Sequence, residues 1–352
     1  MFFTSARLQN YRSYTDSSFE FESGVNIIVG PNASGKTNLL DSLLLISTGH
    51  SIKSSFDFMI KTNQPWARID VLTNKDQSRV VKIYEDKKPE FEIDKEKIKK
   101  ITFNQSVPVV LFEPNQLYQI TTSPEQRRIF IDETLNKTDP DFNKLKNTYL
   151  RILRQRNSLL KQPLSMVKKQ IFAWDIRLCE VAGEYSNKRH TLINKINQNS
   201  NEVYSRIAGD NHKLALLYDS KIKTDNYSNS MLKTLQSKLE LDHLRGFTGV
   251  GPHRDDISIK IDSSDVRNTA SRGETRSILL TLKIIEADLL ESIRQQKPLL
   301  LLDDVFGELD GARRKSLIEL MSTNQTFITT TDADIITHNF AKQTNIITVY
   351  NQ

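Results

Sequence analysis

The stretch that most constrains the fold is "VNIIVGPNASGKTNLLDSLLLIS", residues 25–47, in which an apolar segment, a glycine-framed loop and a helical pattern follow one another. The eight residues from Gly30 to Thr37 match the spacing G-x-x-x-x-G-K-[ST]. A loop of this kind between a buried strand and a helix turns its backbone N–H groups toward an anion at the start of the helix. The stretch therefore predicts an α/β fold with a phosphate-binding loop.

Specific roles follow for the loop residues if the phosphates belong to ATP. Lys36 is expected to reach the β- and γ-phosphates, and the hydroxyl of Thr37 is expected to ligate Mg²⁺. A chance glycine turn before a helix is the alternative, but the order of strand, loop and helix disfavours it. The predicted nucleotide-binding residues of this segment are Gly30, Pro31, Asn32, Ala33, Ser34, Gly35, Lys36, Thr37 and Asn38.

Composition limits the remaining possibilities. A chain of 352 residues is long enough for two domains, or for one domain with a large insertion. The net charge of +6 is compatible with an acidic partner, and the single cysteine, Cys179, excludes a disulfide framework. The N-terminus lacks the apolar core of a signal peptide, and no apolar run approaches the roughly 20 residues of a membrane helix. The expectation is a soluble, cytoplasmic protein.

A second acidic motif lies far from the loop. The segment "KPLLLLDDVFGELD" combines a four-leucine strand, buried on both sides, with Asp303 and Asp304 at its carboxyl end. Ligands of α/β sheets bind at this end of the strands. Asp303 is expected to hold Mg²⁺ through water, and Asp304 to orient and deprotonate an attacking water molecule.

A third motif opens a helix in "TASRGETRSILLTLKIIEADLL". The residues Ser271, Arg272, Gly273 and Glu274 place a serine and a glycine at the helix N-terminus, which is a second potential anion site. Taken alone, the same four residues also fit a simple N-cap with a capping glutamate. The order of the three motifs makes coincidence an unsatisfactory explanation.

This order of motifs resembles the ABC-type ATPase head of the SMC, Rad50 and RecF proteins, and the chain resembles the RecF family most closely. The resemblance covers nearly the whole length and includes "RLQNYRSY", "VVLFEPNQL", "SPEQRRIFID", "LRQRNSLLK", "GVGPHRDDISI", "SRGETRSILLTLKIIEA" and "LLLLDDVFGELD". It implies that ATP is held between two heads, with the Ser271 motif of one chain on the γ-phosphate bound by the other.

The chain departs from the family pattern at two places, and a third segment agrees with it. Gln116 stands where an acidic residue is usual, but related heads use a glutamine there to reach the metal, so it remains a candidate metal ligand. His50 and Lys53 occupy positions where arginines are typical, which puts an arginine-specific role in doubt. After the acidic strand, Thr329 or Thr330 is a candidate γ-phosphate sensor, although both also fit an ordinary strand end.

The resemblance and the change in texture along the chain predict three segments. Residues 1–118 form the N-terminal part of an ATPase lobe, residues 119–245 a helical arm, and residues 246–352 the C-terminal part of the lobe. The arm holds 22 Lys and Arg residues against 14 Asp and Glu residues. Residues 142–174 contain no acidic residue, whereas a solvated helix normally mixes charges. The predicted DNA-binding residues are Lys144, Lys146, Arg151, Arg154, Arg156, Lys161, Lys168 and Lys169.

These features predict an ATP-dependent DNA-binding protein with weak, DNA-stimulated ATPase activity. The resemblance implies a role in recombinational gap repair and replication restart, an ATP-dependent homodimer, and mediator partners of the RecR and RecO type. Nothing resembles a base-reading motif, so binding to DNA is expected to be independent of sequence. An SMC-like architectural head and a transporter ATPase subunit are the alternatives. An SMC-like head needs a much longer coiled coil between its motifs. A transporter subunit usually has a shorter segment between the two motifs that correspond to Lys36 and Ser271 in this chain.

Overall fold

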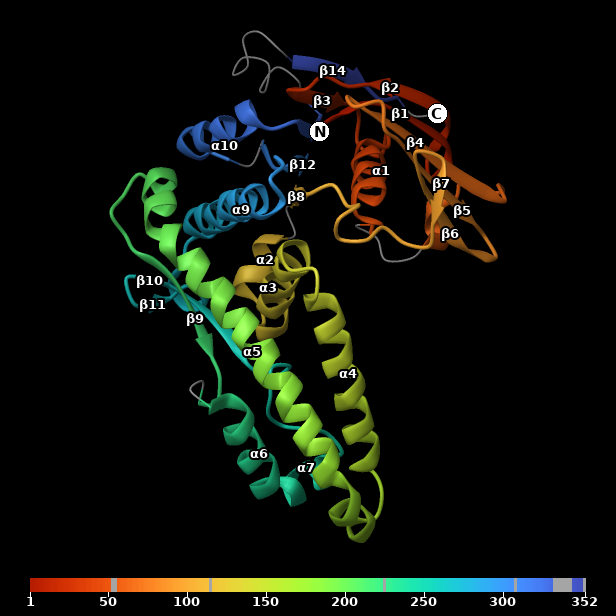
Figure 1. Cartoon of the computed structure of the whole chain (residues 1–352). Coiled ribbons are helices and arrows are strands. Elements are labelled where there is room, and N and C mark those ends of the chain that lie inside the picture. The colour runs from red at the N-terminus through yellow and green to blue at the C-terminus, as the bar shows by residue number, and fades with distance from the viewer. Residues whose placement is uncertain (52–55, 114–115, 224–225, 307–308, 332–343, 351–352) are drawn as a thin grey trace. The chain divides into compact units, whose positions relative to one another are not determined.

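The computed structural model describes all residues except 52–55, 114–115, 224–225, 307–308, 332–343 and 351–352, so Lys53 lies outside the described residues. The chain forms two compact units (Figure 1). Unit 1 comprises residues 1–116, 207–209 and 283–352, and unit 2 comprises residues 117–206 and 210–282.

A five-stranded parallel sheet forms the centre of unit 1. Its strand order is β14-β3-β13-β12-β8, and every neighbouring pair is parallel. Apolar runs such as "LLLL" suit strands that are covered on both faces. The strands are β3 (Val25–Val29), β8 (Val109–Phe112), β12 (Leu299–Asp303), β13 (Thr326–Thr330) and β14 (Thr344–Thr348).

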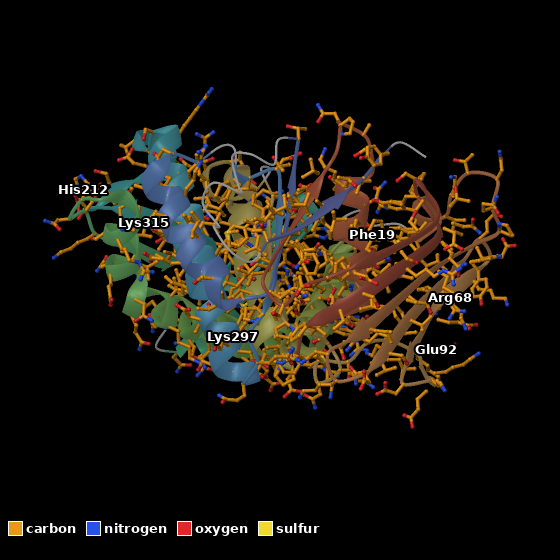
Figure 2. The ribbon with its side chains drawn as sticks, turned by 90° about the horizontal axis from the view of Figure 1, so that it is seen from above. Phe19, Arg68, Glu92, His212, Lys297 and Lys315 are labelled. Atoms are coloured by element: carbon orange, nitrogen blue, oxygen red, sulfur yellow. The ribbon has the colours of Figure 1, made fainter. Side chains whose placement is uncertain are left out.

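A six-stranded antiparallel sheet flanks the parallel one, with the order β2-β1-β4-β5-β6-β7. Alternating buried and more exposed residues in β4 and β5 show one covered face and one wet face. Figure 2 places Phe19, Arg68 and Glu92 on this sheet. The strands are β1 (Phe3–Tyr11), β2 (Tyr14–Glu20), β4 (Trp66–Thr73), β5 (Ser78–Tyr84), β6 (Lys87–Ile93) and β7 (Glu96–Ile98).

Helix α1 (Lys36–Thr48) packs between the two sheets. Its leucines join one apolar core with residues from both sheets, including Leu8, Ile69, Leu301 and Phe327. The other described helices of this unit are the short η1 (Phe56–Met59), α10 (Gly311–Thr323) and the C-terminal part of α9 (Arg272–Arg294). The core fixes the loop that precedes α1 at the carboxyl end of β3.

Unit 2 is mainly helical. Helices α4 and α5 run side by side, and α6 and α7 lie at the end where α4 turns into α5 (Figure 1). The helices are α2 (Gln116–Thr121, at the unit boundary), α3 (Pro124–Thr138), α4 (Phe142–Leu159), α5 (Leu164–Ala208), α6 (Tyr227–Ser237), α7 (Leu239–Arg245) and α8 (Val266–Thr269), followed by the start of α9.

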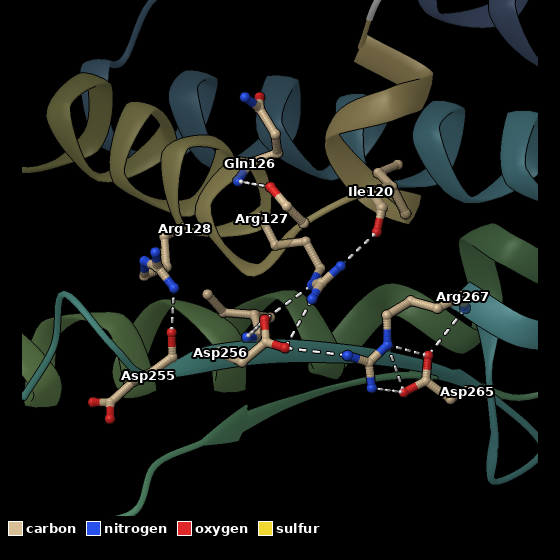
Figure 3. A network of polar contacts seen from close by, with 10 residues as sticks. Ile120, Gln126, Arg127, Arg128, Asp255, Asp256, Asp265 and Arg267 are labelled. Carbon is tan, nitrogen blue, oxygen red and sulfur yellow. Dashed lines mark hydrogen bonds and ion pairs between the residues drawn. The ribbon is translucent and has the colours of Figure 1, made fainter. Parts of the chain in front are cut away.

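A small antiparallel sheet completes unit 2, with the order β11-β10-β9 for β11 (Ser264–Asp265), β10 (Asp256–Ile261) and β9 (Leu214–Asp219). An ion pair and hydrogen bonds join helix α3 to β10 (Figure 3). Arg127 donates two hydrogen bonds to Asp256, at 3.0 and 2.7 Å, and Arg128 donates to the carbonyl of Asp255. Two distant motifs of the sequence, "SPEQRRIFID" and "GVGPHRDDISI", therefore meet in one network.

The expected α/β architecture with an interrupting helical lobe is confirmed. The division of the chain differs in detail from the three segments expected. Residues 246–282, assigned to the ATPase lobe from the sequence, group with the helical unit, because β10 pairs with β9 and α3 bonds to β10.

Candidate nucleotide-binding site and basic surface

The loop between β3 and α1 has the backbone that phosphate binding requires. Gly35, with φ +104°, and Ala33, with φ +65°, adopt left-handed conformations, and a Cβ at Gly30 would lie 2.2 Å from the carbonyl oxygen of Val349. Gly35 is the N-cap of α1 and supplies no side-chain acceptor for the helix N–H groups. The N-terminus of α1 is thus left for an external anion.

Two side chains of the loop lack the partners that a phosphate would supply. The Lys36 ammonium donates to the carbonyls of Gly30 and Pro31, at 2.8 and 2.9 Å, so it is folded back onto its own loop. The hydroxyl of Ser34 is buried and has no hydrogen-bond partner. Buried polar atoms normally find partners. The Lys36 ammonium and the Ser34 hydroxyl both suit a loop that binds phosphate oxygens.

The acids of β12 meet this loop as expected from their position at the carboxyl end of a strand. The hydroxyl of Thr37 lies 3.0 Å from each carboxylate oxygen of Asp303. The buried Thr329 hydroxyl donates to Asp303 at 2.7 Å and accepts a hydrogen bond from the backbone N–H of Asp304 at 2.9 Å. Thr329 therefore contacts the carboxylate of Asp303 and the backbone of Asp304, which the sequence did not reveal, and its role as a γ-phosphate sensor stays a prediction.

Asp304 leaves the strand in a left-handed conformation, with φ +50°. Only a few per cent of non-glycine residues adopt this region, and aspartate is among those that do. The turn exposes Asp304 at the end of β12, whereas Asp303 is half-buried. The two neighbouring acids therefore differ in surroundings, and the different roles expected of them stay predictions.

Gln116 is buried at the start of α2, and its side-chain oxygen accepts a hydrogen bond from the backbone N–H of Glu113 at 3.3 Å. Its predicted role as a metal ligand stays a prediction. His50, the other described departure from the family pattern, is exposed.

The turn between β1 and β2 adds residues that the sequence analysis did not assign. The Tyr14 hydroxyl donates to the carbonyl of Gly35 at 3.0 Å, and the Asn38 side chain donates to Ser13 at 3.0 Å. Arg12 forms a buried ion pair with Asp41 of α1. These contacts hold the phosphate-binding loop and the start of α1 in place. The motif "RLQNYRSY" was the only sequence feature that pointed to them.

The Ser271 motif forms a complete capping box at the N-terminus of α9 in unit 2. The Glu274 N–H donates to the Ser271 hydroxyl at 3.1 Å, and the Ser271 N–H donates to the Glu274 carboxylate at 2.7 Å. The second bond holds the pKa of Glu274 below its usual value. Ser271 and Arg272 are exposed, so this helix end is open to a ligand or a partner chain.

The geometry fits ATP with Mg²⁺. Thr37 and Asp303 place two oxygen ligands side by side, and Lys36 supplies a cation that phosphates can draw from the loop carbonyls. Throughout the described residues, no group of three or more His, Cys, Asp or Glu side chains could hold a different metal. Thr37 and Asp303 supply oxygen ligands of the kind that bind Mg²⁺ together with nucleotide phosphates.

Most of the predicted DNA-binding residues are exposed. Lys144, Arg151 and Arg154 share one face of α4, since they are separated by seven and three residues. Lys161 and Lys169 are also exposed. Two others already have acidic partners: Lys146 forms an ion pair with Asp132, and Lys168 forms one with Glu240.

Arg156 must be removed from this set. Its side chain is fully buried and forms ion pairs with Asp175 at 2.7 Å and Asp242 at 2.9 Å, together with a hydrogen bond to Thr248. Residues 142–174 contain no acid, so the partners of Arg156 come from later in the chain and could not be foreseen from this segment alone. Arg156 holds α4, α5 and α7 together.

His253, in the segment "GVGPHRDD", has a structural environment. Its Nδ1 accepts a hydrogen bond from the Tyr149 hydroxyl at 2.6 Å, and its Nε2 donates to the carbonyl of Thr248 at 3.1 Å. Burial lowers the pKa of His253 to about 4, so the ring is neutral at pH 7. Both ring nitrogens are used in packing the helical unit.

These features define the class of protein: a P-loop ATPase head of the ABC type, with an inserted helical lobe. The family model described as "RecF/RecN/SMC N terminal domain" matches residues 2–352. The head of an SMC protein from Pyrococcus furiosus is similar in fold, with a TM-score of 0.55 at 16% identity. No helix in the described parts of the chain is long and apolar enough to span a membrane.

Closer relatives specify the family. The DNA replication and repair protein RecF of Alkaliphilus oremlandii is 32% identical over 92% of both chains, and that of Clostridium botulinum is 34% identical over 94% of this chain and 93% of its own. The structure of a recombination mediator protein RecF with ATP has a TM-score of 0.84 at 26% identity, covering 99% of this chain and 96% of the other. The chain belongs to the RecF family.

Proposed function

We propose that this chain is an ATP-dependent switch on DNA in recombinational gap repair and replication restart. Two chains would close around two ATP molecules, hold DNA on their helical units and help to load a recombinase through mediator partners of the RecR and RecO type. The observation that carries the proposal is the pairing of the loop at residues 30–37 with Asp303 in a chain that also presents an acid-free basic helix face.

The chemistry of the switch rests on the residues of unit 1. Thr37 and Asp303 would hold Mg²⁺, which would supply positive charge next to the nucleotide phosphates. Lys36 binds the phosphates after leaving the carbonyls of Gly30 and Pro31. Asp304 accepts the proton of the attacking water, and Thr329 holds the backbone N–H of Asp304. Slow turnover suits a switch, because the dimer must persist while partners assemble.

The second chain completes the site in this proposal. The exposed N-terminus of α9, with Ser271 and Gly273, supplies helix N–H groups to the γ-phosphate bound by the other chain. ATP then links the two heads, and ADP, which lacks the γ-phosphate, leaves them apart. The oligomeric state then depends on whether ATP or ADP is bound.

The basic face of α4 gives the DNA contact. One helix face with Lys144, Arg151 and Arg154 neutralises only a few phosphates, which corresponds to weak, non-specific binding of about 10⁻⁴ to 10⁻⁶ M at physiological salt. A dimer offers two such faces to one DNA molecule, and the second contact then becomes intramolecular and tightens binding by about 10²-fold. Hydrolysis releases DNA by separating the two chains.

A salt titration of DNA binding tests the proposal. Gapped duplex DNA is titrated with wild type and with the triple variant Lys144→Ala, Arg151→Ala, Arg154→Ala, each with a non-hydrolysable ATP analogue. The variant should bind more weakly on all sequences. The slope of log K against log salt should become less steep by about 5, because each chain of the dimer loses three phosphate contacts. The variant Lys195→Ala, Lys233→Ala, Lys238→Ala removes the same charge from other exposed positions of unit 2 and should behave like wild type.

Identical curves for wild type and the α4 variant would show that this face does not bind DNA. Equal affinity with the ATP analogue and with ADP would contradict the switch, whatever the DNA surface proves to be.

A further inference from the structure

An exposed apolar patch lies at the end of unit 2 where α4 turns into α5. Its four members are Phe172 and Ile176 of α5, which are 51% and 37% exposed, and Leu241 and Leu244 of α7, which are 41% and 82% exposed. Isolated apolar side chains on a surface are ordinary, whereas large side chains gathered on one surface mark an interaction site. The question is whether these four form one surface.

An ion pair joins the two helices at this place. Lys168, Phe172 and Ile176 follow one another at intervals of four residues along one stripe of α5. Glu240 and Leu244 have the same spacing on α7, and Lys168 bonds to Glu240 at 2.9 Å. The two stripes therefore run next to each other, and Figure 1 shows α7 beside the first turns of α5. The four side chains form one patch.

The support beneath the patch is rigid. Leu160, Val167 and Ile171 form a small buried core, and Leu239 at the start of α7 packs against it. The His243 ring bonds to the carbonyl of Leu160 at 2.8 Å, and the buried Arg156 ties Asp242 of α7 to Asp175 of α5. The apolar side chains are thus presented by a well-packed end of the unit and not by a loose loop.

The surroundings of the patch carry more positive than negative charge, although the exposed Glu180 stands one turn beyond Ile176 on the same stripe of α5. In residues 142–179 and 226–254 the only acids are Asp175, Glu240 and Asp242, and each of them is paired with Arg156 or Lys168. The basic residues at this end include exposed side chains of both helices and their connections, namely Lys161, Lys169, Arg177, Lys238 and Arg245. A complementary partner therefore combines apolar side chains with negative charge.

We propose that this patch, formed by Phe172, Ile176, Leu241 and Leu244, docks a protein segment that is both acidic and apolar, such as an amphipathic helix or an extended acidic tail bearing large hydrophobic side chains. This site is separate from the basic face of α4 and does not depend on the function proposed above. Three of its four members are aliphatic, and aliphatic side chains offer nucleic acid neither charge nor a ring on which a base can stack. A protein segment uses both the apolar area and the charge.

A selection experiment with a matched control tests the proposal on the full chain. A displayed library of random 16-residue peptides is selected on wild type and, in parallel, on the double variant Phe172→Ser, Leu244→Ser. The control variant Phe58→Ser, Leu217→Ser carries the same two substitutions at residues that are also exposed, outside the patch. Wild type and control should enrich peptides rich in Asp, Glu and large apolar residues, and the patch variant should not.

Affinities measured on the enriched peptides complete the test. Fluorescence anisotropy should give at least tenfold weaker binding to the patch variant than to wild type and control, while all three proteins keep the same affinity for gapped DNA. Enrichment of basic peptides, or enrichment that the patch variant shares, would overturn the proposal. A loss of DNA affinity in the patch variant would assign the patch to DNA. Binding of wild type, but not of the patch variant, to phosphatidylglycerol vesicles without peptide enrichment would assign it to a lipid surface.

Discussion

The guanidinium of Arg156 lies 2.9 Å from the carboxylate of Asp242, which is 86 residues further along the chain. The same guanidinium bonds to Asp175, so one buried cation is paired with two buried carboxylates and connects three helices. Burial raises the pKa of Asp175 even beside this cation. The arrangement is stable only while all its charges are present, because each unpaired charge would be buried without solvent.

Replacing Arg156 should therefore lower the free energy of unfolding and leave the affinity for DNA unchanged. Arg156→Leu leaves two buried carboxylates without their cation, and the free energy of unfolding should fall by about 3–5 kcal/mol. The measurement is the midpoint of urea unfolding, followed by circular dichroism. Arg154→Leu, two residues away on the exposed face of α4, is the control and should change the midpoint little. A stable Arg156→Leu protein with weakened DNA binding would restore the role expected from the sequence.

Lys36 and Asp304 should separate nucleotide binding from hydrolysis. Lys36→Met removes the charge that faces the β- and γ-phosphates and should abolish tight ATP binding. Asp304→Asn keeps Thr37 and Asp303 in place, so it should retain ATP affinity and lose turnover. Equilibrium binding of a fluorescent ATP analogue and phosphate release report the two steps. If both variants lose nucleotide affinity equally, Asp304 is not the general base.

Thr329 should affect turnover more than binding. Thr329→Val has the same shape but removes the hydroxyl that donates to Asp303 and accepts from the Asp304 N–H. Loss of such a supporting hydrogen bond typically lowers activity or metal affinity 10- to 100-fold. We expect a decrease of at least tenfold in kcat. Thr329→Ser keeps the hydroxyl and should preserve most of the rate, and an active valine variant would remove Thr329 from the site.

Ser271 tests the contact between two chains. Ser271→Arg places a bulky cation at the N-terminus of α9, where the phosphate bound by the second chain is expected to dock. ATP binding by the single chain should persist, and the ATP-induced dimer should be lost. Sedimentation velocity with ATP and with ADP distinguishes the two states. A stable dimer of the variant in ATP would reject the proposed arrangement of two heads around shared nucleotide.

His253 should make stability fall in mild acid. The folded protein keeps the ring neutral until about pH 4, whereas the unfolded chain takes up a proton near pH 6.5. The unfolded state therefore binds more protons between these values, and stability decreases as pH falls through this window. His253→Gln lacks this titration, so wild type should be more stable than the variant by a larger margin at pH 7 than at pH 5.

Urea midpoints at the two pH values give that margin. Asp255, whose pKa is raised by burial, changes stability in the opposite direction, but it is present in both proteins and cancels in the comparison. An unchanged margin would mean that His253 does not titrate differently in the folded and unfolded states.

The motifs predicted the centre of the fold well, because their physical requirements are local. A glycine loop before α1 and two acids after a leucine strand fix their own backbone and their place at the carboxyl edge of a sheet. The partners of Arg156, the bridging hydroxyl of Thr329 and the pairing of Arg127 with Asp256 depend on contacts between segments far apart in the sequence. A charge pattern in one segment cannot show which distant acid will neutralise it.

The strand order of unit 1 also determines when the nucleotide site can exist. Strand β3, which leads into the phosphate-binding loop, has β13 and β14 as its neighbours, and these strands are made from residues 326–330 and 344–348. Val349 then bonds to Val29 beside Gly30. A chain growing on the ribosome must therefore keep β3 unpaired until almost all of its residues have emerged, and pairing over such a separation is slow. A product that ends before residue 326 lacks both neighbours of β3, so the strand that leads into its phosphate-binding loop has no sheet to hold it.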